Sequence, residues 1–223
     1  MAKKKKSTIP RWMKLLVAAL GTVTIGGGAL AAGNLPYFKG EKVIEVVDGD
    51  TFFIENRQTI RLYGLNAPEL ENCMGQDAKK ALSDLILGKR VQLREPIIDR
   101  GSNRVMTLVY QNKTLINEVM VRAGLAEFDG HGGSQTERMK SANAYARGNN
   151  VGIYSPVCYQ LKPPDPDCVI KGNFDGLKDT KIYYTPTCGW YDLVIIEKHQ
   201  GDDWFCTEAE AREAGFEKSE TCE

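Results

Sequence analysis

The sequence has no excess of charge of either sign. Its 223 residues include 29 Lys and Arg and 29 Asp and Glu, so the formal net charge is zero. Residues 41–160 alone carry 15 basic and 15 acidic side chains. Proteins that bind nucleic acid tightly without sequence preference neutralise many phosphates with Lys and Arg. The central part of the chain therefore does not encode that mode of binding.

Histidine is scarce, and no two cysteines are separated by two residues. His131 and His199 are the only histidines, and His131 has no cysteine or other histidine nearby in the sequence. Structural zinc sites usually take their ligands from closely spaced pairs, so the sequence gives zinc little support. Six cysteines are present, and an even number favours disulfides in an oxidising compartment. These cysteines are Cys73, Cys158, Cys168, Cys188, Cys206 and Cys222.

Acidic residues are absent from the first 40 positions, which contain seven Lys and Arg. Residues 15–32 have no charged side chain and as a helix would span roughly 27 Å at about 1.5 Å per residue, nearly the thickness of a bilayer core. The basic flank stays in the cytoplasm, so we expect the chain after Gly33 to lie outside it. Residues 29–31 also fit a small-x-small cleavage site. Residues 1–40 are therefore predicted to be a signal peptide or a membrane anchor.

The next domain is organised around residues 43–69, VIEVVDGDTFFIENRQTIRLYGLNAPE. Alternating and β-branched residues predict strands over 43–47, 51–54 and 59–63, with a turn at 48–50. Polar side chains stand near the ends of these strands, where they could converge: Asp48, Asp50, Arg61, Asn66 and Glu69. Carboxylate and amide oxygens suit a hard divalent cation, and a guanidinium suits a phosphate. The stretch therefore predicts a metal-assisted phosphodiester site.

Further strands and helices follow this stretch. Residues 75–87 have an apolar face and precede Gly88, which predicts a helix with a glycine at its end. Strands are expected at 90–98 and 104–110, and the segment 99–103 is expected to be a turn. Two more helices are expected at about 115–123 and 136–147. The predicted elements are therefore five strands and three helices.

The motifs VVDGDT and RLYGLNAPE, followed by Arg104 in a strand, resemble the staphylococcal (thermonuclease) nuclease family over roughly residues 42–154. The resemblance implies an α+β fold, a five-stranded OB-fold β-barrel with three helices. Here the barrel is expected to follow an N-terminal hydrophobic helix and to precede a small C-terminal Cys-stapled module. OB barrels often bind nucleic acid. The resemblance also implies a calcium-dependent phosphodiesterase that leaves 3′-phosphate ends on DNA and RNA.

Family roles can be carried over to the matching positions. Asp50, the carbonyl of Asn66 and the main-chain oxygen of Ala67 are expected to bind Ca²⁺. Asp48 is expected to hold the turn or a metal-bound water, and Thr51 to support the site.

The catalytic residues implied by the resemblance are Glu69, Arg61 and Arg104. Glu69 would orient or deprotonate the attacking water. Arg61 and Arg104 would bind the phosphate and stabilise its transition state. For each arginine the alternative is an ordinary surface ion pair.

Three positions depart from the family pattern. Asn66 stands where the family has Asp, which removes a charged ligand and predicts weaker calcium binding. Ala67 replaces a hydroxyl residue. The turn at 99–103 lacks the aromatic residue that the family places there for base stacking, so nucleotide affinity is expected to be lower.

The chain after residue 158 has a different composition. Residues 159–167 are rich in Pro and predict an extended, semi-rigid linker. Residues 168–223 form a small acidic module, separate from the nuclease domain at 41–158. In it, Thr207 and Glu210 predict a capping box for a helix that ends at Gly215. DNA, cell wall or no ligand at all remain open as its target.

A module this small buries little hydrophobic core and needs covalent or metal cross-links for stability. Its four cysteines lie 16 to 20 positions apart, which favours two disulfides over zinc, although YYTPTC and WFCTEAEAREAGF resemble the zinc-binding segment of alkylation-damage response proteins. The tail pairing is left open. Cys73 and Cys158 would form the third bridge.

The sequence thus predicts an exported, metal-dependent nuclease acting on DNA and RNA. We expect a monomer without a small-molecule cofactor, bound to a membrane only if the N-terminal helix is uncleaved. One alternative is a noncatalytic nucleic-acid-binding OB module at the cell envelope, although Glu69 and both arginines are present. Another is an envelope adhesion factor whose acidic tail binds partners.

Overall fold

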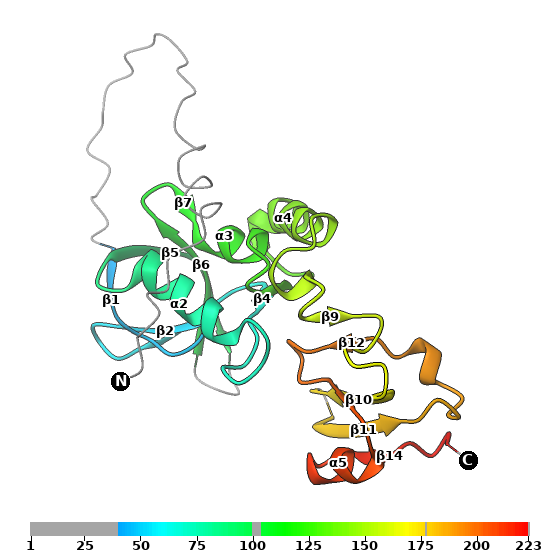
Figure 1. The fold of residues 1–223 in the computed structure, drawn as a ribbon. Coiled ribbons are helices and arrows are strands. Elements are labelled where there is room, and N and C mark those ends of the chain that lie inside the picture. The colour runs from blue at the N-terminus through cyan, green and yellow to red at the C-terminus, as the bar shows by residue number, and fades with distance from the viewer. Residues whose placement is uncertain (1–39, 100–103, 177, 223) are drawn as a thin grey trace, which may run out of the picture. The chain divides into compact units, whose positions relative to one another are not determined.

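The computed structural model describes residues 40–99, 104–176 and 178–222 (Figure 1). The chain divides into two units, Met1–Phe38 and Lys39–Glu223, and the second is described below. The expected N-terminal hydrophobic helix and most of the expected turn at 99–103 lie outside the described residues. Within those residues, every helix is too short or too polar to cross a bilayer.

A closed β-barrel forms the first part of the second unit. Its strands follow the order β3-β2-β1-β5-β6, and a parallel pairing of β3 with β6 closes the barrel. The five predicted strands and the barrel are confirmed. The two-residue strand β7, Thr114–Leu115, extends the sheet beside β6. The barrel strands are β1 Glu41–Val46, β2 Thr51–Ile54, β3 Thr59–Leu62, β5 Arg90–Asp99 and β6 Arg104–Gln111.

Two irregularities bend the long strands. The register of β1 against β2 shifts between Val43 and Glu45, and that of β5 against β6 shifts between Arg94 and Ile97. In the second, Glu95 has a φ of 54°. An extra residue in one strand of a pair increases local twist, which helps so few strands curve into a barrel.

Three helices accompany the barrel at the predicted positions: α2 Gly75–Ile86, α3 Ile116–Arg122 and α4 Thr136–Gly148. The apolar face of α2 is buried in the core, including Leu82 and Ile86. Burying an aliphatic side chain of this size stabilises a fold by roughly 1.5–3 kcal/mol. The 3₁₀ turns η1 Gly133–Gln135 and η2 Gly152–Tyr154 flank α4.

A short ladder lies beside the barrel. Strand β4, Leu65–Asn66, pairs antiparallel with β8, Glu127–Phe128. In this register Asn66 is paired with Glu127. The ladder fixes the start of the loop that connects β4 to α2.

The C-terminal module has a sheet and a core of its own. The sheet order is β13-β10-β11-β14, and helix α5, Glu208–Glu213, packs through Ala211 in the module's core. Thr207 Oγ1 accepts the N–H of Glu210, and Glu210 accepts the N–H of Thr207, so the predicted capping box is confirmed. The sheet strands are β10 Ile170–Asp175, β11 Thr180–Tyr184, β13 Asp203–Phe205 and β14 Glu217–Lys218.

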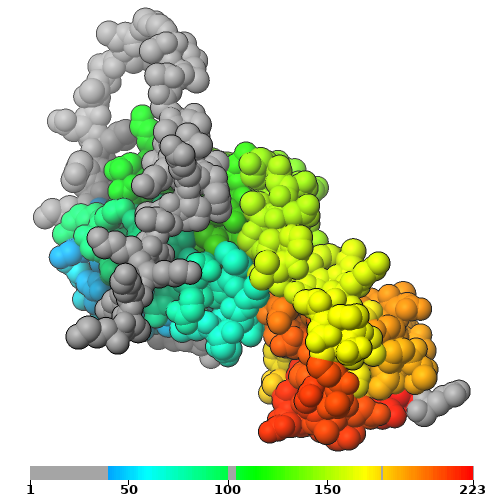
Figure 2. All heavy atoms as spheres, viewed as in Figure 1, coloured from blue at the N-terminus to red at the C-terminus, as the bar shows by residue number. Residues whose placement is uncertain are grey.

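The segment expected to be a linker begins with a strand. Strand β9, Tyr159–Gln160, pairs antiparallel with β12, Ile196–Glu197. In Figure 2 the yellow atoms around residue 160 lie against orange atoms of the module. The 3₁₀ turn η3, Tyr191–Leu193, precedes β12.

Three disulfides join all six cysteines. Cys73 pairs with Cys158, Cys168 with Cys206, and Cys188 with Cys222. The expected bridge at Cys73 and the preference for tail disulfides over zinc are both confirmed. Among the described residues, no three or more His, Cys, Asp or Glu side chains gather into a group that could hold a metal ion.

Candidate active site

The turn between β1 and β2 is built by Asp48. Its Oδ1 accepts the main-chain N–H of Asp50 at 2.9 Å and that of Thr51 at 2.7 Å. Gly49 lies within this turn, where a Cβ would be 2.6 Å from the Cβ atoms of both Ala67 and Ala78. Only glycine allows the turn to approach the following loop and helix α2 this closely.

Asp50 is the centre of a hydrogen-bond network and is 2% exposed. Its Oδ1 accepts bonds from Thr51 Oγ1 at 2.8 Å and from Arg61 Nη1 at 2.5 Å. Its Oδ2 accepts the main-chain N–H of Ala67 at 3.0 Å. Burial raises the pKa of Asp50 to about 6 and Asp48 adds to the increase, while Arg61 and the hydrogen bonds oppose it. The charged carboxylate is therefore costly to bury and favours nearby positive charge.

Arg61 connects the two sides of the site. It donates Nη1 to Asp50 and Nη2 to Asn66 Oδ1, the latter at 2.8 Å. Its side chain is 21% exposed. A guanidinium has five N–H donors, and these bonds use two of them. Arg61 can therefore hold the site together and still donate to an anion.

Arg104 is placed relative to Arg61 by the strand pairing that closes the barrel. Arg61 pairs with Met106 in the parallel β3–β6 ladder, and Arg104 precedes Met106 by two residues. Side chains two residues apart in a strand share a face, so both arginines lie on one face, about 7 Å apart along the strand direction. Arg104 also forms an ion pair with Asp99 at 3.5 Å.

Glu69 lies in the loop between β4 and α2 and is exposed. Its main-chain oxygen accepts the N–H of Asn72 at 3.0 Å. A Cβ at Gly75 would lie 1.9 Å from that oxygen, so the loop packs closely against the start of α2. In the part of the chain that the structure describes, the Glu69 carboxylate has no hydrogen-bond or ion-pair partner. It is therefore available to accept a hydrogen bond from a water molecule.

The network brings most of the predicted residues together, but not all of them. Side-chain or main-chain hydrogen bonds join the six residues Asp48, Asp50, Thr51, Arg61, Asn66 and Ala67. Glu69 follows in the adjoining loop, and Arg104 is placed through the β3–β6 pairing. Two contacts of these residues were not predicted. Asn66 Oδ1, expected to be a metal ligand, accepts a bond from Arg61, and Ala67 contributes its N–H to Asp50.

The donor chemistry of these groups fits a hard divalent cation. The available atoms are carboxylate oxygens, the Asn66 amide oxygen and the Ala67 main-chain oxygen, which are the ligand types that Ca²⁺ prefers. Asp50 Oδ2 accepts one hydrogen bond from the protein and retains a further lone pair. The buried carboxylate would also be stabilised by a cation.

Two contacts near the site join residues that sequence patterns do not connect. Glu127, paired with Asn66, accepts a hydrogen bond from Gln200 at 3.1 Å. Asn72, three residues after Glu69, donates to the main-chain oxygen of His199 at 3.4 Å. The partners lie 73 and 127 residues apart in sequence, beyond the reach of any local signal.

The barrel and the cluster of Asp50, Arg61 and Asn66 define an OB-fold protein with a polar site at strand ends. Comparison with known families gives the same class. The family described as Staphylococcal nuclease homologue matches residues 59–156.

Similar proteins include a micrococcal nuclease from Shigella flexneri, 34% identical over 131 residues, which are 53% of this chain and 74% of that relative. An uncharacterized endonuclease from Haemophilus influenzae is 37% identical over 89 residues, 38% of this chain and 49% of the relative. Protein ParB from Escherichia coli is 28% identical over 151 residues, 62% of this chain and 81% of the relative. The chain belongs to the staphylococcal nuclease homologue family.

Proposed function

We propose that this protein is an exported, calcium-dependent nuclease that hydrolyses phosphodiester bonds of DNA and RNA. The observation that carries the proposal is the position of Arg61, whose guanidinium donates to both Asp50 and Asn66 at the start of the Glu69 loop. Relatives named as a micrococcal nuclease and an endonuclease support the same activity.

Each of these residues has a separate role in the proposed reaction. Arg61 and Arg104 bind the phosphate oxygens and stabilise the charge that develops on them in the transition state. Glu69 orients a water molecule and takes its proton as the water oxygen bonds to phosphorus. The bond from phosphorus to the 5′ oxygen breaks, that oxygen takes a proton from solvent water, and Glu69 returns its proton to solvent, which gives a 3′-phosphate and a 5′-hydroxyl.

A divalent cation would be held by Asp50, with Asn66 and the main-chain oxygen of Ala67 as neutral ligands. When bound, it would supply electrostatic stabilisation of the negative phosphoryl group. Asp48 keeps Asp50 in place through its two bonds to the turn. Thr51 Oγ1 fixes the orientation of the Asp50 carboxylate.

Export is supported by the disulfides. Bridges of this kind persist in oxidising compartments and are rare in the cytosol. Three bridges involving all six cysteines agree with a location outside the cytoplasm. The basic and apolar pattern of residues 1–32 supports the same location, as a signal peptide or as an anchor.

The direct test is cleavage of single-stranded DNA, duplex DNA and RNA by the purified full-length protein. Calcium should support cleavage, a chelator should stop it, and the products should carry 3′-phosphates. Binding of the same substrates without cleavage under any divalent cation would instead indicate a noncatalytic binding module.

A further inference from the structure

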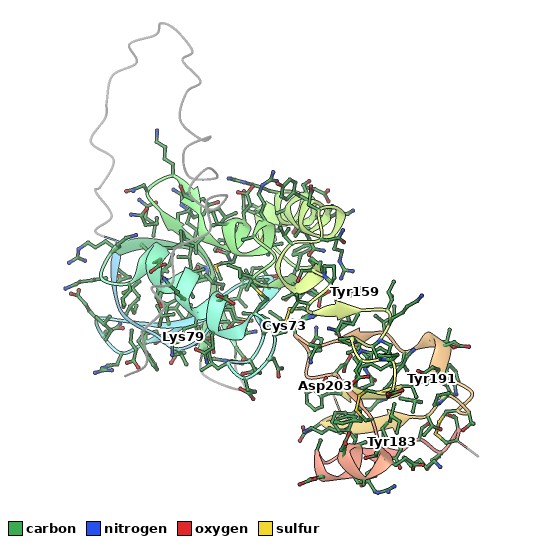
Figure 3. The ribbon with its side chains drawn as sticks, in the orientation of Figure 1. Cys73, Lys79, Tyr159, Tyr183, Tyr191 and Asp203 are labelled. Carbon is green, nitrogen blue, oxygen red and sulfur yellow. A yellow bond between two sulfur atoms is a disulfide. The ribbon has the colours of Figure 1, made fainter. Side chains whose placement is uncertain are left out.

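The loop that carries Glu69 contacts the C-terminal module at its far end. The main-chain N–H of Cys73 donates to the Lys198 oxygen at 3.3 Å, and Asn72 Nδ2 donates to the His199 oxygen at 3.4 Å. Cys73 is also bonded to Cys158, immediately before β9. Figure 3 labels Cys73 and Tyr159 on the two neighbouring segments. The end of the loop is therefore fixed outside the barrel.

The start of the loop is supported from the same direction. Gln200 Nε2 donates to Glu127 Oε2 at 3.1 Å. The other carboxylate oxygen of Glu127 accepts a bond from Arg147 at 2.7 Å. Glu127 is the ladder partner of Asn66, the last residue of β4. Residues 198–200 therefore contact the loop itself and the strand partner at its start.

Residues 198–200 are held by hydrogen bonds to Cys158, at the end of the barrel domain, and within the module. The Lys198 N–H donates to the Cys158 oxygen at 2.8 Å, and the Gln200 N–H donates to the Glu197 oxygen at 2.7 Å. The Glu197 N–H donates to the buried Asp202 carboxylate at 3.0 Å. His199 is 4% exposed. A segment with these bonds can act as a rigid support, whereas an isolated surface loop moves more freely.

We propose that residues 198–200, together with the Cys73–Cys158 disulfide, position the Glu69 loop for catalysis. Gln200, Asn72 and the two cysteines are then positioning residues, because they act on Glu69 and Asn66 through the loop and the β4–β8 ladder. The C-terminal module lies beyond the family match at residues 59–156. It would nevertheless help to hold the active-site loop in its catalytic position. This proposal rests on the nuclease function proposed above.

Small displacements of catalytic groups lower the reaction rate strongly. A shift of about 1 Å caused by a distant mutation can cost about 10²-fold in rate. Removing one support from a loop held by several should have a smaller effect, so we expect Gln200→Ala to lower kcat about 3- to 10-fold with little change in KM. The double variant Cys73→Ser/Cys158→Ser should lower kcat further, because it removes the covalent support.

Gln111→Ala is the matched control. Gln111 is at the end of β6, where its side chain accepts a bond from Asn112, and it belongs to none of the site's hydrogen bonds. This variant should keep the wild-type kcat. Each effect is then measured again in the Glu69→Gln background. If Gln200 acts by positioning Glu69, its loss should cost clearly less there than in the wild type.

Amide hydrogen exchange provides a readout that does not depend on activity. The Asn72 and Cys73 amides should exchange at least several-fold faster in Gln200→Ala and in the cysteine variant, while the core of β6 keeps its protection. A wild-type protein without nuclease activity would contradict the proposed function. Hydrogen exchange in the variants would still show whether residues 198–200 and the disulfide stabilise the loop. An active wild type whose kcat and loop exchange are unchanged in both variants would overturn the positioning proposal. Equal fold losses with and without Glu69 would overturn it too.

Discussion

Arg61 donates a hydrogen bond from Nη2 to Asn66 Oδ1 at 2.8 Å, and this bond links strand β3 to strand β4. The amide oxygen accepts the bond without contributing a negative charge. Asp50 is therefore the carboxylate that pairs with Arg61 in this network, at 2.5 Å. A cation bound at the site would compete with the positively charged Arg61 for the oxygens of Asp50 and Asn66.

Asn66→Asp should lower the calcium concentration needed for half-maximal activity. The substitution adds a charged oxygen ligand, and ligand charge tunes calcium affinity. Calcium titrations of activity for the two proteins measure the change. Asn56→Asp is the control, since Asn56 is exposed in the β2–β3 turn and its side chain accepts the Gln58 N–H. An equal or higher calcium requirement in Asn66→Asp would mean that residue 66 does not bind the metal.

The tail disulfides should contribute strongly to stability. The Cys168–Cys206 bridge closes a loop of 38 residues, for which the chain-entropy model gives about 4 kcal/mol. Cys168→Ser/Cys206→Ser should lower the free energy of unfolding of the module by an amount of that order. Denaturant titration measures it, and peptide mapping without reductant checks the three pairings. Four alkylated tail thiols with one equivalent of zinc would contradict the disulfides.

His199 should make stability depend on pH. Burial lowers the pKa of His199 from 6.5 to about 4, and the charge of Arg147 contributes. Between these values the unfolded chain binds a proton that the folded protein does not, so the free energy of unfolding falls as the pH falls from 6.5 to 4. The full loss would be about 3 kcal/mol at about 1.4 kcal/mol per pKa unit.

His199→Gln should remove this part of the pH dependence. Urea titrations of both proteins at pH 7, 5.5 and 4 measure it. Parallel profiles for the two proteins would show that His199 titrates normally in the folded state.

The capping box of α5 should be measurable on its own. Thr207→Ala removes the side-chain acceptor of the Glu210 N–H. Losing such a cap costs about 1 kcal/mol. The variant should therefore unfold at a slightly lower denaturant concentration. A stability equal to the wild type would mean that the helix end is satisfied in another way.

The strands and helices of this domain could be predicted because they follow clear periodic patterns, and the resemblance of the motifs to the nuclease family implied that they form a barrel. Residues 59–62 alternate, α2 has a continuous apolar face, and Thr207 with Glu210 is a local capping signal. Strand β9 could not be predicted, because two residues carry no periodicity and Pro-rich surroundings suggested a linker.

Long-range contacts could not be predicted from the sequence for a different reason. The motifs indicated that Asp50, Arg61 and Asn66 converge. They could not indicate that Arg61 takes the Asn66 oxygen, which depends on how the barrel places β3 beside β4. The bond from Gln200 to Glu127 arises only when the module packs near β8, and no spacing in the chain records it.

The most direct test of the account is the cleavage rate of a single-stranded DNA oligonucleotide by wild type, Arg61→Ala and Glu69→Gln in calcium. Removing one transition-state contact usually costs about 10²-fold or more in rate. We expect losses of that size in both variants, with folding unchanged by circular dichroism and thermal unfolding. Activity close to wild type in both variants would contradict the assignment of this site as the catalytic centre.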